Sequence, residues 1–272
     1  MWFFRVVDGL WALFPVVLAV LAVRPVSDRE LRQFTDRYGL EHTAETVPAV
    51  TRSVRRGRTG RLACAALGLS LYPVLYDLGL TIPNQSAFYG FTGYLLGAFV
   101  TALVPGMPRG EARRASLVPR TPGDYLPGTA LVMPAVAVAV STVAVLVYDF
   151  EPRRAFADFH GTADGLALTA VAVVATFIAV RTVVARPQPL TTPGLVAIDD
   201  AVRTQAVHTL AGAGIAVALL GTSACLFEMG GYASPEWLQI TGLVAGIGAL
   251  TGTVAAWTFR RSPWHVERST LQ

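Results

Sequence analysis

Three acidic residues lie inside long apolar stretches of the sequence, where a charge is costly. Asp8, Asp77 and Glu228 each interrupt a run of mostly apolar residues. Carboxylates in such positions face a bundle interior or a water-filled cavity, where they bind cations or relay protons. If the three side chains converge, they form an acidic vestibule suited to a cation or a proton-coupled solute. The alternative is that Asp77 and Glu228 only reach the membrane surface and that Asp8 pairs with Arg5.

Two tyrosines precede one of these acids. Tyr72 and Tyr76 are four residues apart, so a helix places them on the same face. Pro73 lies between them and has no backbone N–H, which leaves one helix carbonyl without its usual partner. We therefore include both tyrosines with the acids as candidate substrate-binding residues.

The histidines do not have a metal-binding spacing. They occur at His42, His160, His208 and His265 and form neither His-x-x-x-His nor His-Glu-x-x-His. The sequence also has no Gly-x-Ser-x-Gly nucleophile motif. We expect no metal, no cofactor and no enzymatic activity.

All 22 basic residues are arginine. A P-loop ATPase needs the lysine of Gly-x-x-x-x-Gly-Lys, and a retinal protein needs a lysine for its Schiff base, so both classes are excluded. The sequence pI of about 9.4 comes from arginines in the loops between apolar segments. It gives no reason to expect nucleic-acid binding.

Seven apolar stretches must position the candidate residues. Hydrophobic residues make up 53% of the chain and charged residues 15%, whereas soluble domains have roughly 25% charged residues. A hydrocarbon core about 30 Å thick requires about 20 apolar residues per helix. The stretches are continuously apolar, which favours helices over barrel strands. We predict an all-α polytopic membrane protein with seven transmembrane helices, at 6–23, 62–80, 87–104, 126–148, 164–185, 208–229 and 237–258.

The arginines lie mostly on one side of the predicted membrane. If the seven helices alternate, 19 arginines fall on one side, nine of them in the segment 24–61, and 3 fall on the other. Basic residues accumulate on cytoplasmic loops. We therefore expect a multi-pass protein of the cell membrane with its N-terminus outside and its C-terminus in the cytoplasm.

The sequence contains an internal similarity. Phe-Thr-Gly-Tyr-Leu-Leu-Gly (91–97) resembles Ile-Thr-Gly-Leu-Val-Ala-Gly (240–246), 149 residues later, and further matches recur at an offset of 148. We interpret this as a parallel three-one-three repeat, as occurs in some transporters. The alternative is coincidence in a composition rich in glycine, alanine, leucine and threonine. The predicted parts are repeat 1, a linker helix and repeat 2, at about 6–104, 126–148 and about 164–258.

The cytoplasmic loop 24–61 has helical structure of its own. Ser27 and Glu30 form a capping-box pattern, which predicts a helix over about 28–38. We expect a second helix to begin near Pro48.

Three arginines, Arg52, Arg55 and Arg56, lie on this second helix as it approaches the membrane. We expect Gly57 and Gly60 to break or bend it before the next span. One interpretation makes the loop a contact for a cytoplasmic protein partner. The alternative is an interfacial segment whose arginines bind anionic lipid headgroups.

Two glycine pairs have the spacing of close helix contacts. Gly93 and Gly97, and likewise Gly242 and Gly246, are four residues apart and allow helix backbones to approach closely. We expect them to pack helices within the chain rather than between two copies.

Several segments resemble uncharacterised multi-pass membrane proteins of actinobacteria. These are Ser-Leu-Val-Pro-Arg (116–120), Asp-Tyr-Leu-Pro (124–127) and Ile-Asp-Asp-Ala-Val-Arg (198–203), together with the all-arginine composition. The resemblance implies a membrane location and a lineage, and it carries over no activity.

Two functional hypotheses follow from the sequence. The first is a small-solute transporter or exporter that uses the acidic vestibule. The second is a non-enzymatic membrane subunit, a permease-like partner of a separate ATPase or regulator, which contacts its partner through the loop 24–61.

Overall fold

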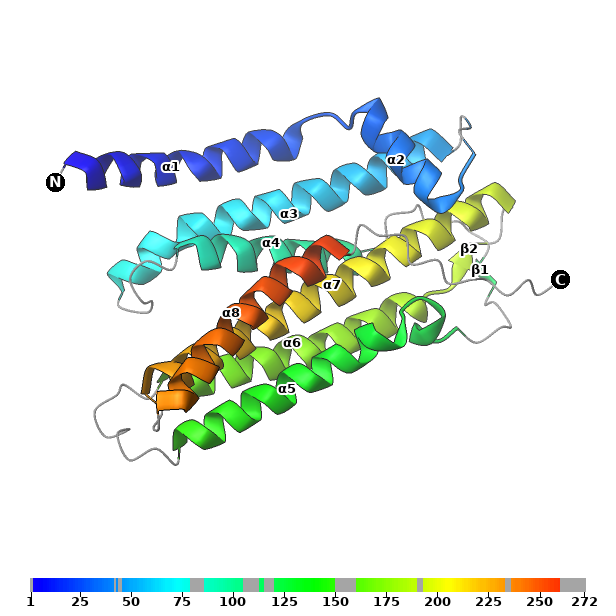
Figure 1. The fold of residues 1–272 in the computed structure, drawn as a ribbon. Coiled ribbons are helices and arrows are strands. Elements are labelled where there is room, and N and C mark those ends of the chain that lie inside the picture. The colour runs from blue at the N-terminus through cyan, green and yellow to red at the C-terminus, as the bar shows by residue number, and fades with distance from the viewer. Residues whose placement is uncertain are drawn as a thin grey trace. The chain divides into compact units, whose positions relative to one another are not determined.

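A computed structural model describes residues 2–41, 43, 46–78, 86–104, 113–114, 120–149, 160–189, 193–232 and 236–259. These residues form eight α-helices, which Figure 1 shows in chain order. The helices are α1 (Trp2–Val23), α2 (Asp28–Tyr38), α3 (Thr46–Asp77), α4 (Ser86–Leu103), α5 (Gly128–Asp149), α6 (His160–Val184), α7 (Pro193–Tyr232) and α8 (Glu236–Phe259). A 3-10 turn, η1 (Pro122–Asp124), precedes α5, and β1 (Arg113–Arg114) pairs antiparallel with β2 (Gln188–Pro189).

The chain divides into two compact units. Unit 1 comprises Met1–Pro119 and Ala185–Ala206, and unit 2 comprises Arg120–Val184 and Val207–Gln272. The first part of α7 therefore belongs to unit 1 and the remainder to unit 2. Each unit has its own packing, and we describe them separately.

Four helices in the described part of the chain are long and apolar enough to cross a membrane. Their apolar segments are Gly128–Val147, Ala163–Val184, Val196–Gly231 and Glu236–Ala256. Two shorter apolar helical segments are Leu13–Val23 and Tyr89–Leu103. The prediction of a helical protein with helices long and apolar enough to cross a membrane is confirmed, whereas the seven spans and the three-one-three repeat stay predictions.

Two helices are longer than the spans expected for them. The 32 residues of α3 and the 40 residues of α7 correspond to about 48 Å and about 60 Å of helix, more than the roughly 30 Å of a hydrocarbon core. Of the break or bend expected at Gly57 and Gly60, the break is wrong, because α3 is continuous through both. Gly60 is a packing residue, since a Cβ there would collide with Thr101 on α4.

Unit 1 is organised around the contact between α3 and α4. A Cβ at Gly97 would lie 2.8 Å from the Cα of Arg61, and one at Gly93 would collide with the carbonyl oxygen of Cys64. Real Cβ atoms do not fit at such distances, so glycine is what allows these two backbones to touch.

The predicted helix at 28–38 is confirmed as α2, with the capping box formed by Ser27 and Glu30. Leu31 and Phe34 are buried on its inner face and pack with Val50 of α3 and Ala201 of α7. The helix ends at Gly39, whose φ of 61° is the left-handed conformation that glycine adopts without strain. The apolar face of α2 is thus covered within unit 1.

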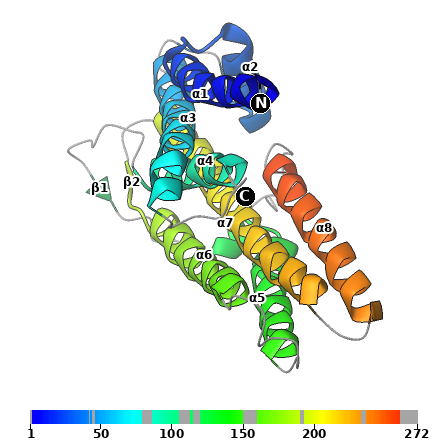
Figure 2. The same ribbon diagram turned by 90° about the vertical axis from the view of Figure 1, so that its left-hand side faces the viewer.

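Unit 2 packs α5, α6, the second part of α7, and α8 through small residues. Figure 1 and Figure 2 both show α5 beside α6. Ala137, Ala172 and Ala218 meet in one buried cluster from three helices. A Cβ at Gly165 of α6 would lie 2.8 Å from the carbonyl oxygen of Gly221 on α7. Small side chains thus let these helices approach closely.

Candidate functional site

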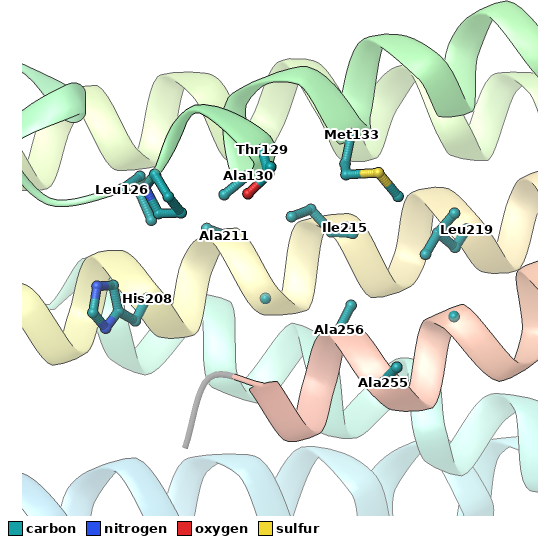
Figure 3. Close-up of a pocket in the computed structure, with 13 residues that line it drawn as sticks. Leu126, Thr129, Ala130, Met133, His208, Ala211, Ile215, Leu219, Ala255 and Ala256 are labelled. Atoms are coloured by element: carbon teal, nitrogen blue, oxygen red, sulfur yellow. The ribbon is translucent and has the colours of Figure 1, made fainter. Parts of the chain in front are cut away.

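A cavity of about 330 Å³ lies among α5, α7 and α8 in unit 2. Figure 3 shows it in close-up, with lining side chains from all three helices. The lining residues are Leu126, Pro127, Thr129, Ala130, Met133, His208, Ala211, Gly212, Ile215, Leu219, Gly252, Ala255 and Ala256.

Small side chains create this space. Most of the residues that α7 and α8 contribute are glycine or alanine, and α5 contributes Ala130. Larger apolar side chains form the walls, among them Met133, Ile215 and Leu219 (Figure 3). The volume lies at the lower end of the range for small-molecule pockets, about 300–1,000 Å³.

The lining is polar near one end. His208 lies at the end of the cavity near Leu126, and Leu219 lies toward the opposite end (Figure 3). Nε2 of His208 is 2.8 Å from the carbonyl oxygen of Tyr125. Because a carbonyl oxygen only accepts hydrogen bonds, Nε2 carries the proton and donates. His208 is 8% exposed, so this contact fixes the orientation of a buried imidazole.

A second polar feature of unit 2 is a group of buried hydroxyls. Ser141 of α5 donates a hydrogen bond to Thr222 of α7 at 2.9 Å and lies 3.4 Å from the hydroxyl of Thr169 on α6. Thr222 donates to the carbonyl of Ala218 at 2.9 Å, and Thr169 donates to that of Gly165 at 2.8 Å. Every hydroxyl has a partner, so the group joins three helices.

The predicted acidic vestibule lies largely outside the described residues. Asp8 and Asp77 belong to α1 and α3, but their side chains, and that of Tyr76, are not among those the structure describes. Glu228 is half-buried on α7 in unit 2. The convergence of the three acids stays a prediction.

Tyr72 is half-buried on α3 and contacts a neighbouring aromatic ring. Its ring centroid lies 5.5 Å from that of Tyr89 on α4, with the planes inclined at 49°. This arrangement is typical of packed aromatic pairs. Tyr72 therefore contributes to the contact between α3 and α4.

The two predicted glycine pairs both lie in contacts within the chain, but at different registers. Gly93 lies against Cys64 and Ala65 of α3. Gly242 lies against Leu226 and Gly230 of α7. If the repeat were exact, with an offset of 148, Gly242 would instead contact positions 212 and 213, the counterparts of Cys64 and Ala65. The residues of α3 that contact Gly93 and the residues of α7 that contact Gly242 are therefore not equivalent positions in the proposed repeat.

Gly246, the second glycine of the pair on α8, also contacts α7. A Cβ at Gly246 would lie 2.9 Å from the ring of Phe227, and the hydroxyl of Ser223 donates to the Gly246 carbonyl at 3.0 Å. Gly246 therefore combines a close approach with a hydrogen bond between α7 and α8.

Arg52, Arg55 and Arg56 are exposed on α3. Nε of Arg52 donates to the carbonyl of Pro48 at 3.3 Å. Because the apolar face of α2 is covered within unit 1, the exposed side chains among the described residues of the loop 24–61 are mainly charged. That surface is suited to anionic lipid headgroups or to an acidic protein surface.

A buried arginine in unit 1 was not anticipated from the sequence. Arg203 of α7 is 5% exposed and donates to the carboxylate of Asp199 and to the carbonyl of Arg186, both at 2.8 Å. Arg186 in turn donates to the carbonyls of Ala102 and Leu103, at the end of α4. The spacing of four between Asp199 and Arg203 was the available sequence feature.

The network of Asp199, Arg203 and Arg186 also lowers the basicity of Arg186. Burial first, and then the charge of Arg203, lower the pKa of Arg186, while Asp199 opposes the change. Arginine nevertheless stays protonated at physiological pH. Arg186 therefore acts as a charged cap for the last carbonyls of α4.

Among the residues that the structure describes, no group of three His, Cys, Asp or Glu side chains could hold a metal ion. Comparison of the chain with protein-family models, curated proteins and solved structures finds no match. The geometry of the two units is therefore the basis for the functional proposal.

Proposed function

We propose that the chain is a seven-span protein of the cell membrane that moves a small, largely apolar solute through the helices of unit 2. The observation that carries this proposal is the cavity among α5, α7 and α8. A pocket of about 330 Å³ with mostly apolar walls and few polar groups has the composition of a small-molecule site.

The exposed surface of unit 2 supports a membrane location. Large apolar side chains on α6 and α8 are more than half exposed, among them Val171 at 65% and Val244 at 64%. Apolar side chains are stable in contact with lipid tails, whereas contiguous exposure of this kind is uncommon on soluble proteins.

The distribution of arginine supports an N-terminus outside and a C-terminus in the cytoplasm. In that orientation α5 and α7 enter the membrane from the cytoplasm and α8 returns to it. The three-one-three repeat is a sequence prediction, and the different contact registers of its glycine pairs weigh against it.

Cysteine labelling tests this topology. In a variant with Cys64→Ala and Cys225→Ala, single cysteines replace Arg29 and, separately, Asn84. A membrane-impermeant maleimide should label position 84 in intact cells and position 29 only after lysis. The reverse pattern would overturn the orientation.

Translocation in proteoliposomes tests transport. The full chain is reconstituted with amphiphiles that carry the fluorophore NBD on a charged head and an aromatic, branched or straight tail of about a dozen carbons. Dithionite added outside bleaches only accessible fluorophore. We expect faster bleaching of the inner pool than in protein-free vesicles for at least one tail. Bleaching of the inner pool at the rate of protein-free vesicles, for every tail, would contradict the proposal.

Matched variants connect the rate to the cavity. Ala256→Leu fills the cavity from α8 and should slow translocation, whereas Ala135→Leu adds the same volume on an exposed position of α5 outside the lining and should leave the rate unchanged. Equal slowing by both substitutions would mean that the solute does not pass through this site.

The exposed arginines of the loop 24–61 favour a second candidate, a membrane subunit that binds a cytoplasmic protein. The test is purification of the tagged chain from native membranes in mild detergent. A stoichiometric partner that Arg52→Glu, Arg55→Glu and Arg56→Glu together release would support it. A chain that purifies alone would exclude this candidate.

A further inference from the structure

We infer that the cavity in unit 2 binds one straight acyl chain, with the polar head of a fatty acid beside His208 and the end of the chain near Leu219. This inference rests on the proposed function for the membrane orientation of unit 2. It specifies the class of solute: a single-chain amphiphile, rather than an apolar molecule without a head.

The depth of the cavity supports a chain from one leaflet. His208 and Leu219 are eleven residues apart on α7, which corresponds to about 16 Å along the helix axis. Half of a hydrocarbon core about 30 Å thick is about 15 Å. In the proposed orientation, His208 lies near the cytoplasmic interface and Leu219 near the midplane. The cavity therefore spans the depth of the inner leaflet.

The distribution of polar groups supports an amphiphile. Of the residues that line the cavity, His208 and Thr129 carry side-chain nitrogen or oxygen atoms, and Leu219 at the other end is aliphatic. A solute that is polar at one end only has the same asymmetry. In this placement the carboxyl group lies at the His208 end, and the methylenes lie along the part of the cavity that Ile215 and Met133 line (Figure 3).

The volume supports a single chain. A cavity of about 150 Å³ holds one benzene molecule, so about 330 Å³ holds roughly a dozen carbon atoms by proportion. That is the size of a dodecanoyl chain. The second chain of a diacyl phospholipid would have to stay outside the cavity.

Photocrosslinking of the purified full-length protein in nanodiscs tests the inference. One dodecanoic acid probe carries a diazirine at its terminal carbon, and a second carries it near the carboxyl group. We expect the first to label Ile215, Leu219 or Met133 and the second to label the chain near His208 or Leu126. Labelling confined to exposed side chains, or the opposite polarity, would overturn the inference.

Filling the cavity should abolish this labelling. Ala130→Leu and Ala256→Leu each add three carbons to the lining, and one methylene in an apolar pocket changes affinity by about tenfold or more. We expect at least about tenfold less crosslinking, with Ala135→Leu unchanged. Thermal unfolding identifies any variant that fails to fold.

A second variant keeps the inference testable if the filled variants do not fold. Met133→Ala removes three side-chain atoms from a partly exposed position of the lining. The chain length that competes best with the probe should then increase by roughly three carbons, because Met133 lines the cavity toward its Leu219 end (Figure 3) and its truncation adds space there. An unchanged optimum would count against the inference.

Competitors distinguish the sources of the chain. Dodecanoic acid should displace the probe at lower concentration than a lysophospholipid or a diacyl phospholipid, and preferential displacement by the diacyl lipid would overturn the single-chain assignment. Labelling without translocation would refute transport and leave the binding site established. Translocation without labelling would refute the acyl-chain site and leave transport standing.

Discussion

Arg58 of α3 donates a hydrogen bond from Nη1 to the carboxylate of Glu30 on α2 at 3.2 Å. The same arginine donates from Nη2 to the carbonyl of Arg24, just after α1. The neighbouring hydroxyl of Thr59 donates to the Ala22 carbonyl at 2.8 Å. One turn of α3 therefore holds the end of α1 and the start of α2 together.

Glu30 should make the stability of α2 depend on pH. The backbone N–H of Ser27 and, to a smaller extent, the charge of Arg58 lower the pKa of Glu30 below its usual 4.5, although burial opposes the shift. A lowered folded pKa stabilises α2 above the unfolded pKa, and this stabilisation is lost as pH falls through the folded pKa. Glu30→Gln should reduce the stability of α2 by about 1 kcal/mol near neutral pH.

Hydrogen exchange measured by mass spectrometry checks this prediction. After correction for the intrinsic pH dependence, protection of α2 should fall below pH 4.5 in the native chain and stay low throughout in the variant. Trypsin cleavage after Arg29 and Arg32 should be faster in the variant at neutral pH. Identical protection of the two proteins would show that the capping box contributes nothing measurable.

Gly97→Ala should destabilise unit 1, whereas Gly57→Ala should not. A Cβ at Gly97 would lie 2.8 Å from both the Cα of Arg61 and the Cβ of Cys64, but one at Gly57 meets only the end of the Arg61 side chain at 4.0 Å. Overpacking costs about 1–3 kcal/mol, whereas alanine in a helix is favoured over glycine by up to about 1 kcal/mol. Thermal unfolding in detergent should separate the two variants in opposite directions.

Asp199→Asn should cost about 3 kcal/mol, because it leaves the buried charge of Arg203 without its carboxylate. The two side chains are 17% and 4% exposed, respectively. Asp36→Asn makes the same change of charge on the exposed face of α2 and should change stability by less than about 0.5 kcal/mol. Denaturant titration of both variants measures the difference, and equal losses would mean that the Asp199–Arg203 pair contributes no more than a surface charge.

Ser141 and Thr222 should show a measurable coupling energy. A double-mutant cycle with Ser141→Ala and Thr222→Val isolates the hydrogen bond of 2.9 Å between their hydroxyls. Such bonds between membrane helices average about 0.6 kcal/mol and reach about 1.7 kcal/mol. A coupling within error of zero would indicate that the Ser141 hydroxyl finds another acceptor when Thr222 is replaced, such as the hydroxyl of Thr169 at 3.4 Å.

The sequence by itself determined the helical class and the local helix starts. Apolar stretches of membrane length require helices, and the capping box of Ser27 and Glu30 predicts α2 because its hydrogen bonds connect residues only three apart. Both are local properties of the chain, so one sequence is enough to predict them.

Only the tertiary structure decided what the small residues do. The sequence predicts a break or bend at Gly60, but α3 continues through this residue, because the missing side chain lets α4 pack closely at Thr101. The cavity beside His208 likewise depends on which faces of α5, α7 and α8 oppose one another. Which faces oppose one another depends on how closely the three helix backbones approach. The residue spacing within one helix cannot predict the cavity, because residues distant in sequence line it together.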